Sequence, residues 1–91
     1  MSKKGFYVGD IYPEYDIWVT GASYIGRPLD NTIMYVTKKV EHLINNLSGH
    51  QNCLVFTENG INPRDDIAQK NIFIFSEIPQ RDYIQFANLY F

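Results

Sequence analysis

Apolar residues along this chain gather in short runs, and turn residues separate one run from the next. The pattern predicts strands at 6–8, 16–20, 32–36, 53–56 and 71–75. The last three runs are almost continuously apolar, which is typical of strands that are buried on both faces of a sheet. Gly21 is expected to end the second strand, and Pro28 to Asn31 has the composition of a turn.

Two amphipathic helices are also expected. The first runs from Thr37 to Ser48, with Thr37 as its N-cap and Gly49 as a left-handed C-terminal cap. Its apolar stripe has helical spacing and consists of Val40, Leu43, Ile44 and Leu47. The second helix runs from Pro79 to Phe91, and its stripe consists of Tyr83, Phe86, Ala87 and Tyr90. A short helical turn is expected at 65–70.

Strands that alternate with helices indicate an α/β fold. We expect a small mixed sheet of about four to five strands with these two main helices. The chain has 91 residues, which fits a single domain covering 1–91. The sequence shows no internal repeat, low-complexity segment or interdomain linker.

Composition excludes several classes of function. The net charge is −2, which gives no basic footprint for nucleic acid. No apolar run approaches the ~20 residues that a membrane span needs, and no signal peptide is evident. The single cysteine, Cys53, fits a reducing compartment, so a cytoplasmic location is expected.

No catalytic motif is present in the sequence, and no residue spacing indicates a metal or cofactor site. Cys53 begins a buried strand and is expected to be a core residue. His42 lies off the apolar stripe of its helix and is expected at the surface, and His50 falls at the C-terminus of that helix. Without a nucleophile beside a base, a small enzyme is the least favoured function.

The passage from the 32–36 strand into the first helix is the best candidate for a ligand site. A strand that ends at a helix N-terminus leaves free backbone N–H groups, which favour anionic or polar ligands. The turn residues Asp30 and Asn31 are candidate contacts, although a turn favours the same residues. Side chains that either line such a pocket or belong to the core are Tyr24, Met34, Tyr35 and Thr37.

Four segments carry a resemblance to a known family. They are 25–29, DNTIMYVTKKV at 30–40, NCLVF at 52–56 and NIFIFSEIPQRDYIQFANLYF at 71–91. In order and spacing they resemble the N-terminal domain of UDP-3-O-(3-hydroxyacyl)glucosamine N-acyltransferase, a lipid A biosynthesis enzyme. The resemblance implies a non-catalytic domain that recognises a nucleotide sugar and forms the N-terminal part of a larger acyltransferase. That family's catalytic histidine lies in a β-helix domain, which would also carry homo-oligomerisation.

The family's strand-to-helix motif binds uracil between two aromatic rings and through an asparagine. These positions correspond here to Met34, Val40 and Thr37, while Lys39 keeps the residue of the motif. The resemblance therefore implies a UDP-sugar-like ligand at Asp30, Asn31, Met34, Thr37, Lys39 and Val40, with no cofactor.

The alternative function is a protein-interaction or assembly module without a small ligand. Tyrosine and tryptophan are enriched at interfaces. The last helix and four residues near the N-terminus would then form the contact surface, namely Tyr7, Tyr12, Tyr15 and Trp18.

Overall fold

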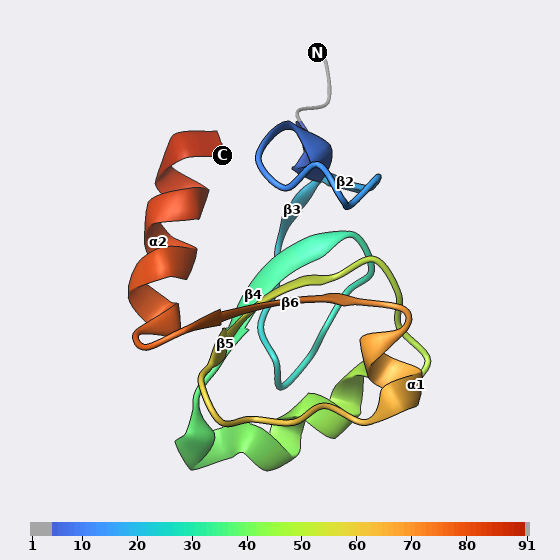
Figure 1. Cartoon of the computed structure of the whole chain (residues 1–91), viewed down its shortest axis with the longest axis vertical. Coiled ribbons are helices and arrows are strands. Elements are labelled where there is room, and N and C mark those ends of the chain that lie inside the picture. The colour runs from blue at the N-terminus through green and yellow to red at the C-terminus, as the bar shows by residue number, and fades with distance from the viewer. Residues whose placement is uncertain (1–4, 91) are drawn as a thin grey trace.

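A parallel sheet of four strands in the order β3-β4-β5-β6 organises the domain (Figure 1). The computed structural model describes residues 5–90. The strands are β3 (Gly21–Ala22), β4 (Thr32–Val36), β5 (Leu54–Glu58) and β6 (Ile72–Ser76). In register, Ile33 pairs with Leu54 and Leu54 pairs with Ile72. Elements cover both faces of this sheet, which explains why three of its strands are almost continuously apolar.

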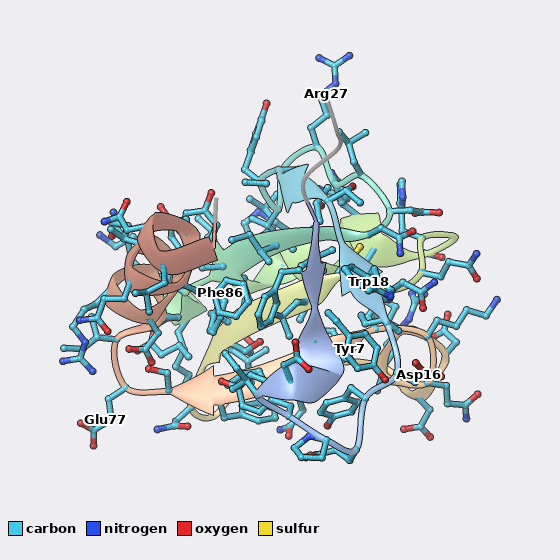
Figure 2. All side chains as sticks on the ribbon, turned by 90° about the horizontal axis from the view of Figure 1, so that it is seen from above. Tyr7, Asp16, Trp18, Arg27, Glu77 and Phe86 are labelled. Carbon is cyan, nitrogen blue, oxygen red and sulfur yellow. The ribbon has the colours of Figure 1, made fainter. Side chains whose placement is uncertain are left out.

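The N-terminal segment and the last helix cover one face of the sheet. Strands β1 (Phe6–Tyr7) and β2 (Trp18–Val19) form a separate antiparallel pair, joined through the 3₁₀ turn η1 (Val8–Asp10) and a loop. Helix α2 (Pro79–Tyr90) packs beside this pair (Figures 1 and 2). Phe86 of α2 meets Phe6 edge to face at 5.1 Å and Phe56 of β5 at 5.6 Å between ring centroids. The Phe86 ring therefore connects α2 with the β1–β2 pair, called the hairpin below, and with the sheet.

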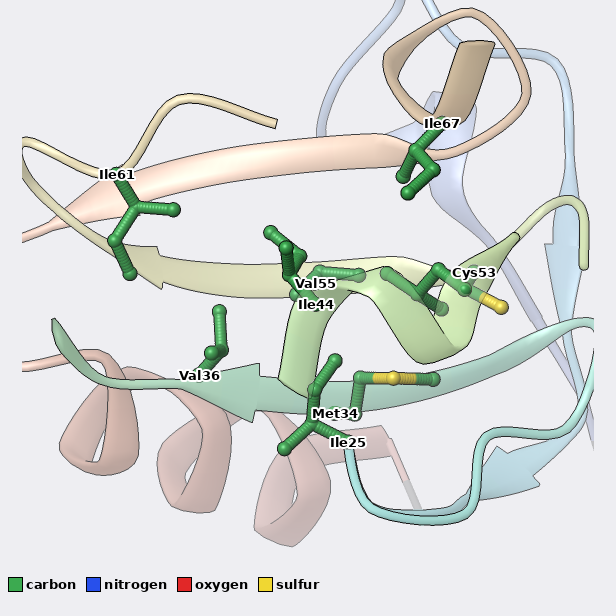
Figure 3. Close-up of a cluster of buried hydrophobic side chains, with 9 residues drawn as sticks. Ile25, Met34, Val36, Ile44, Cys53, Val55, Ile61 and Ile67 are labelled. Atoms are coloured by element: carbon green, nitrogen blue, oxygen red, sulfur yellow. The ribbon is translucent and has the colours of Figure 1, made fainter. Parts of the chain in front are cut away.

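The opposite face is covered by η2 (Lys38–Leu47) and by the short helix α1 (Asp65–Ala68). Side chains from both elements meet those of β4 and β5 in a second core, which Figure 3 shows. Met34, Leu47 and Val55 are fully buried in it. The two cores lie on opposite faces of one sheet because side chains alternate between the faces along each strand.

The buried amide of Asn71 links three segments on this second face. Its Oδ1 accepts the Cys53 N–H at 3.0 Å. Its Nδ2 donates to the carbonyls of His50 (3.2 Å) and Ile67 (3.1 Å). One side chain thus holds the start of β5, the segment after η2 and the end of α1.

The α/β class, the two main helices and the short helical turn at 65–70 are confirmed. The expected antiparallel pairing lies in the separate β1–β2 pair rather than within the main sheet. The expected 16–20 strand is shorter, at Trp18–Val19, and Gly21 begins β3 instead of ending a strand. Phe91, the expected last residue of the second helix, lies outside the described residues.

The first helix differs from the expected regular helix in its geometry. It is of 3₁₀ type, and Val40 has non-helical angles (φ −124°, ψ 31°) that divide it. A β-branched residue near the start and the pair Asn45 and Asn46 near the end favour α-helix only weakly. The apolar stripe nevertheless faces the core, with Ile44 and Leu47 buried. Gly49 has φ +86°, as expected for a left-handed cap.

Candidate functional site

The six residues of the expected ligand site do not come together. Asp30 and Asn31 precede the amino end of β4, whereas Thr37, Lys39 and Val40 follow its carboxyl end. A strand rises about 3.3 Å per residue, so Asn31 and Thr37 are separated by ~20 Å along β4. The six residues therefore do not line one compact pocket.

Both turn residues are used within the protein. The Asp30 carboxylate hydrogen-bonds the His50 ring at 2.8 Å and accepts the Gln51 N–H at 3.2 Å, and these two bonds lower the pKa of Asp30. Asn31 has φ +60°, a left-handed conformation that asparagine tolerates, and donates its side-chain N–H to the Trp18 carbonyl at 2.9 Å. Asp30 and Asn31 therefore hold the entry into β4 in place.

Met34 and Val40 belong to the core that faces η2. Met34 is fully buried, and Val40 is partly buried and packs against the same cluster. Lys39 is exposed at the start of η2. Tyr35 faces the other core, where its ring lies 5.0 Å from that of Tyr83, while Tyr24 is 63% exposed. The side chain of Met34, at one of the family's stacking positions, has no exposed surface for a ligand.

A carboxylate from the neighbouring strand occupies the N-terminus of η2. Glu58 Oε1, at the end of β5, accepts the Lys38 N–H at 2.7 Å. Thr37 has the extended backbone of an N-cap, but its hydroxyl makes no cap hydrogen bond. The expectation that the Thr37 hydroxyl caps this helix is thus wrong, because Glu58, which is 20 residues away in sequence, takes its place. An incoming anion would have to displace Glu58 from Lys38.

We expect Glu58→Ala to lower the free energy of unfolding by about 1 kcal/mol, as removal of an N-cap side chain usually does. Thr37→Ala is the matched control and should cost less than ~0.5 kcal/mol, since no hydrogen bond is lost. Urea denaturation followed by circular dichroism measures both values. Equal losses in the two variants would contradict capping by Glu58.

The cysteine is buried in an environment that makes its thiol unreactive. Cys53 is buried, donates its thiol to the Leu29 carbonyl at 3.3 Å, and has its pKa raised to about 11 by desolvation. A thiol in that state is not a nucleophile at neutral pH.

His42 is exposed, as expected. Within residues 5–90, no group of three His, Cys, Asp or Glu side chains is placed to hold a metal ion, and none of the helices there is long and apolar enough to span a bilayer.

The outer edge of β6 is a second candidate site, which sequence analysis did not identify. Ile72 donates its N–H to the Cys53 carbonyl at 2.8 Å, and the Ser76 carbonyl accepts the Asn59 N–H at 3.0 Å. Because alternate residues direct their backbone groups to opposite sides of a strand, Phe73 and Phe75 direct theirs away from β5. β6 is the last strand in the sheet order, and no described residue pairs with these outward groups.

Apolar side chains accompany this open edge. Phe75 is 51% exposed, and Ile78, just beyond the strand, is 48% exposed. Figure 2 shows β6 along one margin of the sheet, with the loop of the β1–β2 hairpin passing over it. A shallow cavity of about 470 Å³ lies nearby on α2 and is lined by Ile78, Gln80, Arg81, Ile84 and Gln85. The strand β6 and the start of α2 thus present a continuous stretch of chain with exposed apolar residues.

The aromatic residues expected to form an interface near the N-terminus are mostly engaged internally. Tyr7 hydrogen-bonds Asp16 at 2.8 Å and lies 5.4 Å from Trp18, ring to ring (Figure 2). Tyr12 and Tyr15 are half-buried against the core beneath α2. Of the four residues, only Trp18 is more than half exposed, at 57%.

Comparisons of this chain with protein-family models, with curated proteins and with solved structures gave no significant match. The resemblance to the acyltransferase domain therefore stays a prediction.

Proposed function

We propose that this domain is a protein-interaction module that binds an extended partner segment along the outer edge of β6. The observation that carries the proposal is the row of outward backbone groups at Phe73 and Phe75, which no described residue uses. An extended segment laid against such an edge gains main-chain hydrogen bonds, and pockets for its side chains add selectivity.

The contrast between the two sheet edges supports this function. Proteins normally protect an edge strand with charge, proline, a bulge or short length. The opposite edge, β3, has only two residues. β6 has five residues, IFIFS, with no charge, proline or glycine, and its register with β5 is continuous from Ile72 to Ser76. An unprotected apolar edge of this kind favours strand pairing with another chain.

Nucleotide-sugar recognition within an acyltransferase stays a prediction from the resemblance. Two features of the structure favour the interaction function over it. The helix N-terminus that would receive the ligand is capped by Glu58, and Met34 is buried. The β6 edge, by contrast, has outward backbone groups at Phe73 and Phe75 that no described residue uses.

A peptide titration tests strand addition directly. The probe is the synthetic peptide KNIFIFSE, which copies residues 70–77, added to dilute ¹⁵N-labelled domain. We expect the amides of Phe73 and Phe75 to shift and to exchange more slowly with solvent. The amide of Ile74 should change less, because it already faces β5.

The matched variants are Phe75→Lys, on the edge, and Leu89→Lys, at an exposed apolar position on α2. Phe75→Lys should weaken peptide binding by about tenfold or more, since an aromatic cross-strand contact is lost and a charge is added. Leu89→Lys should bind as the wild type does. Strand addition at β6 is refuted if the peptide binds both variants equally, or if no amide of β6 responds at millimolar peptide.

A further inference from the structure

We propose that the partner segment is β6 of a second copy of this chain, paired antiparallel about a twofold axis at Ile74. This inference rests on the proposed function and names its partner. Only Phe73 and Phe75 direct their backbone groups outward from the strand. Antiparallel pairing then places Phe73 opposite Phe75 of the second copy, and Phe75 opposite its Phe73. In each such pair, both residues donate their N–H to the carbonyl of the other, so all the outward backbone groups of β6 form hydrogen bonds.

The side chains of the strand match themselves in this register. Phe73 and Phe75 lie on one face of the sheet, so each forms an aromatic cross-strand pair with the second copy, a combination that stabilises antiparallel strands. Ile74 lies on the other face and meets Ile74 of the second copy at the axis, where opposite residues come closest. The pairing would cover the side chain of Phe75, half of which is exposed in the single chain.

Charges at the two ends of the strand favour antiparallel self-pairing. Lys70 precedes β6 and Glu77 follows it, and both are exposed. The register that places Phe73 opposite Phe75 also places Asn71 opposite Glu77 of the second copy. Lys70 and Glu77 of the second copy therefore lie at the same end of the paired strands, one residue out of register and with their side chains on opposite faces of the sheet. Symmetry repeats this pair at the other end. A parallel arrangement of two β6 strands would instead place Lys70 beside Lys70 and Glu77 beside Glu77.

The order of the strands allows the two sheets of the dimer to join in one plane. The order β3-β4-β5-β6 ends at β6, so pairing joins the two four-stranded sheets into one continuous sheet. The hairpin and α2 lie in a layer above one face of the sheet (Figure 1), where they also cover Ile72 and Ile74 of β6. A second copy would pair in the plane of the sheet, beneath this layer. In a twofold interface the same surface of both copies must fit itself. The Phe-Ile-Phe pattern of β6 meets this condition, because it reads the same in both directions from Ile74.

Light scattering coupled to size-exclusion chromatography tests the inference on the whole chain over a range of concentrations. We expect a dimer that dissociates on dilution. Phe75→Lys should leave a monomer, because symmetry introduces two lysines into the interface, and Leu89→Lys should dimerise like the wild type. Circular dichroism checks that both variants are folded.

A charge exchange provides a test that does not alter the apolar residues. Lys70→Glu and Glu77→Lys should each weaken the dimer by about two- to threefold at low salt, since each brings like charges to both ends of the paired strands. The double variant should restore dimerisation to near the wild-type level, because opposite charges again lie at each end of the pair. Absence of rescue would contradict the antiparallel register.

The outcomes separate this inference from the proposed function. A chain that stays monomeric at all concentrations but binds the KNIFIFSE peptide at Phe73 and Phe75 overturns the second-copy partner and keeps strand addition. A chain that neither dimerises nor binds the peptide overturns both. A dimer that persists in Phe75→Lys places the interface elsewhere and also overturns the inference.

Discussion

Replacing Asn71 with alanine is expected to lower the free energy of unfolding by about 3 kcal/mol, because three backbone groups lose a hydrogen bond to the buried amide at once. The Cys53 N–H loses its acceptor, and the carbonyls of His50 and Ile67 lose a donor. A buried polar group without a partner costs about 1–3 kcal/mol, more than an ordinary hydrogen bond contributes. Urea denaturation followed by circular dichroism gives the value.

Asn46→Ala is the matched control for this substitution. Asn46 is an exposed amide with one hydrogen bond, from its Nδ2 to the Ile25 carbonyl at 3.1 Å. Its loss should cost about 1 kcal/mol or less, because water replaces the missing partner. If the Asn71 and Asn46 variants were equally stable, the three hydrogen bonds of the Asn71 side chain would make no special contribution to stability.

Phe86→Ala is expected to be the most destabilising substitution in α2, by about 3–5 kcal/mol, as is usual when a buried phenylalanine becomes alanine. The substitution removes the ring that contacts both Phe6 and Phe56, so it loosens the hairpin as well as the helix. We expect faster amide hydrogen exchange at Phe6 and Val19 in addition to the lower stability.

Ile84→Ala controls for the general effect of shortening an apolar side chain in the same helix. Ile84 is 45% exposed, so its truncation should cost about 1 kcal/mol or less and leave exchange in the hairpin unchanged. The expected role of Phe86 is contradicted if amide exchange at Val19 is the same in Phe86→Ala as in the wild type.

The parts of the fold that sequence predicts well are those with local causes. β4 and β6 were expected within a residue of their positions, because continuous apolar runs are typical of buried parallel strands. The stripe of η2 faces the core as expected, but periodicity reveals which face is buried rather than the hydrogen-bond pattern. The start of β3 at Gly21 could not be expected, since it depends on pairing with Thr32 in another segment.

The candidate site depends even more on contacts between distant parts of the chain. The passage from β4 into η2 has the local pattern of a ligand site, but Glu58 caps that helix from another strand. Asp30 is likewise tied to His50 across 20 residues. The open edge of β6 had a local signal, the uncharged run IFIFS, but its position at the end of the sheet appears only once the strand order is known.

The two cores differ in how much of the chain must be synthesised before they can form. Every member of the core between the sheet and η2 falls between Ile25 and Phe73. The core beneath α2 needs Phe6 from one part of the chain and Phe86 from another. Because domains begin to fold while the chain is still emerging from the ribosome, the first core can assemble on a nascent chain that still lacks α2. The hairpin, although it is synthesised first, would then pack only once Phe86 is available, so the order of folding would differ from the order of synthesis.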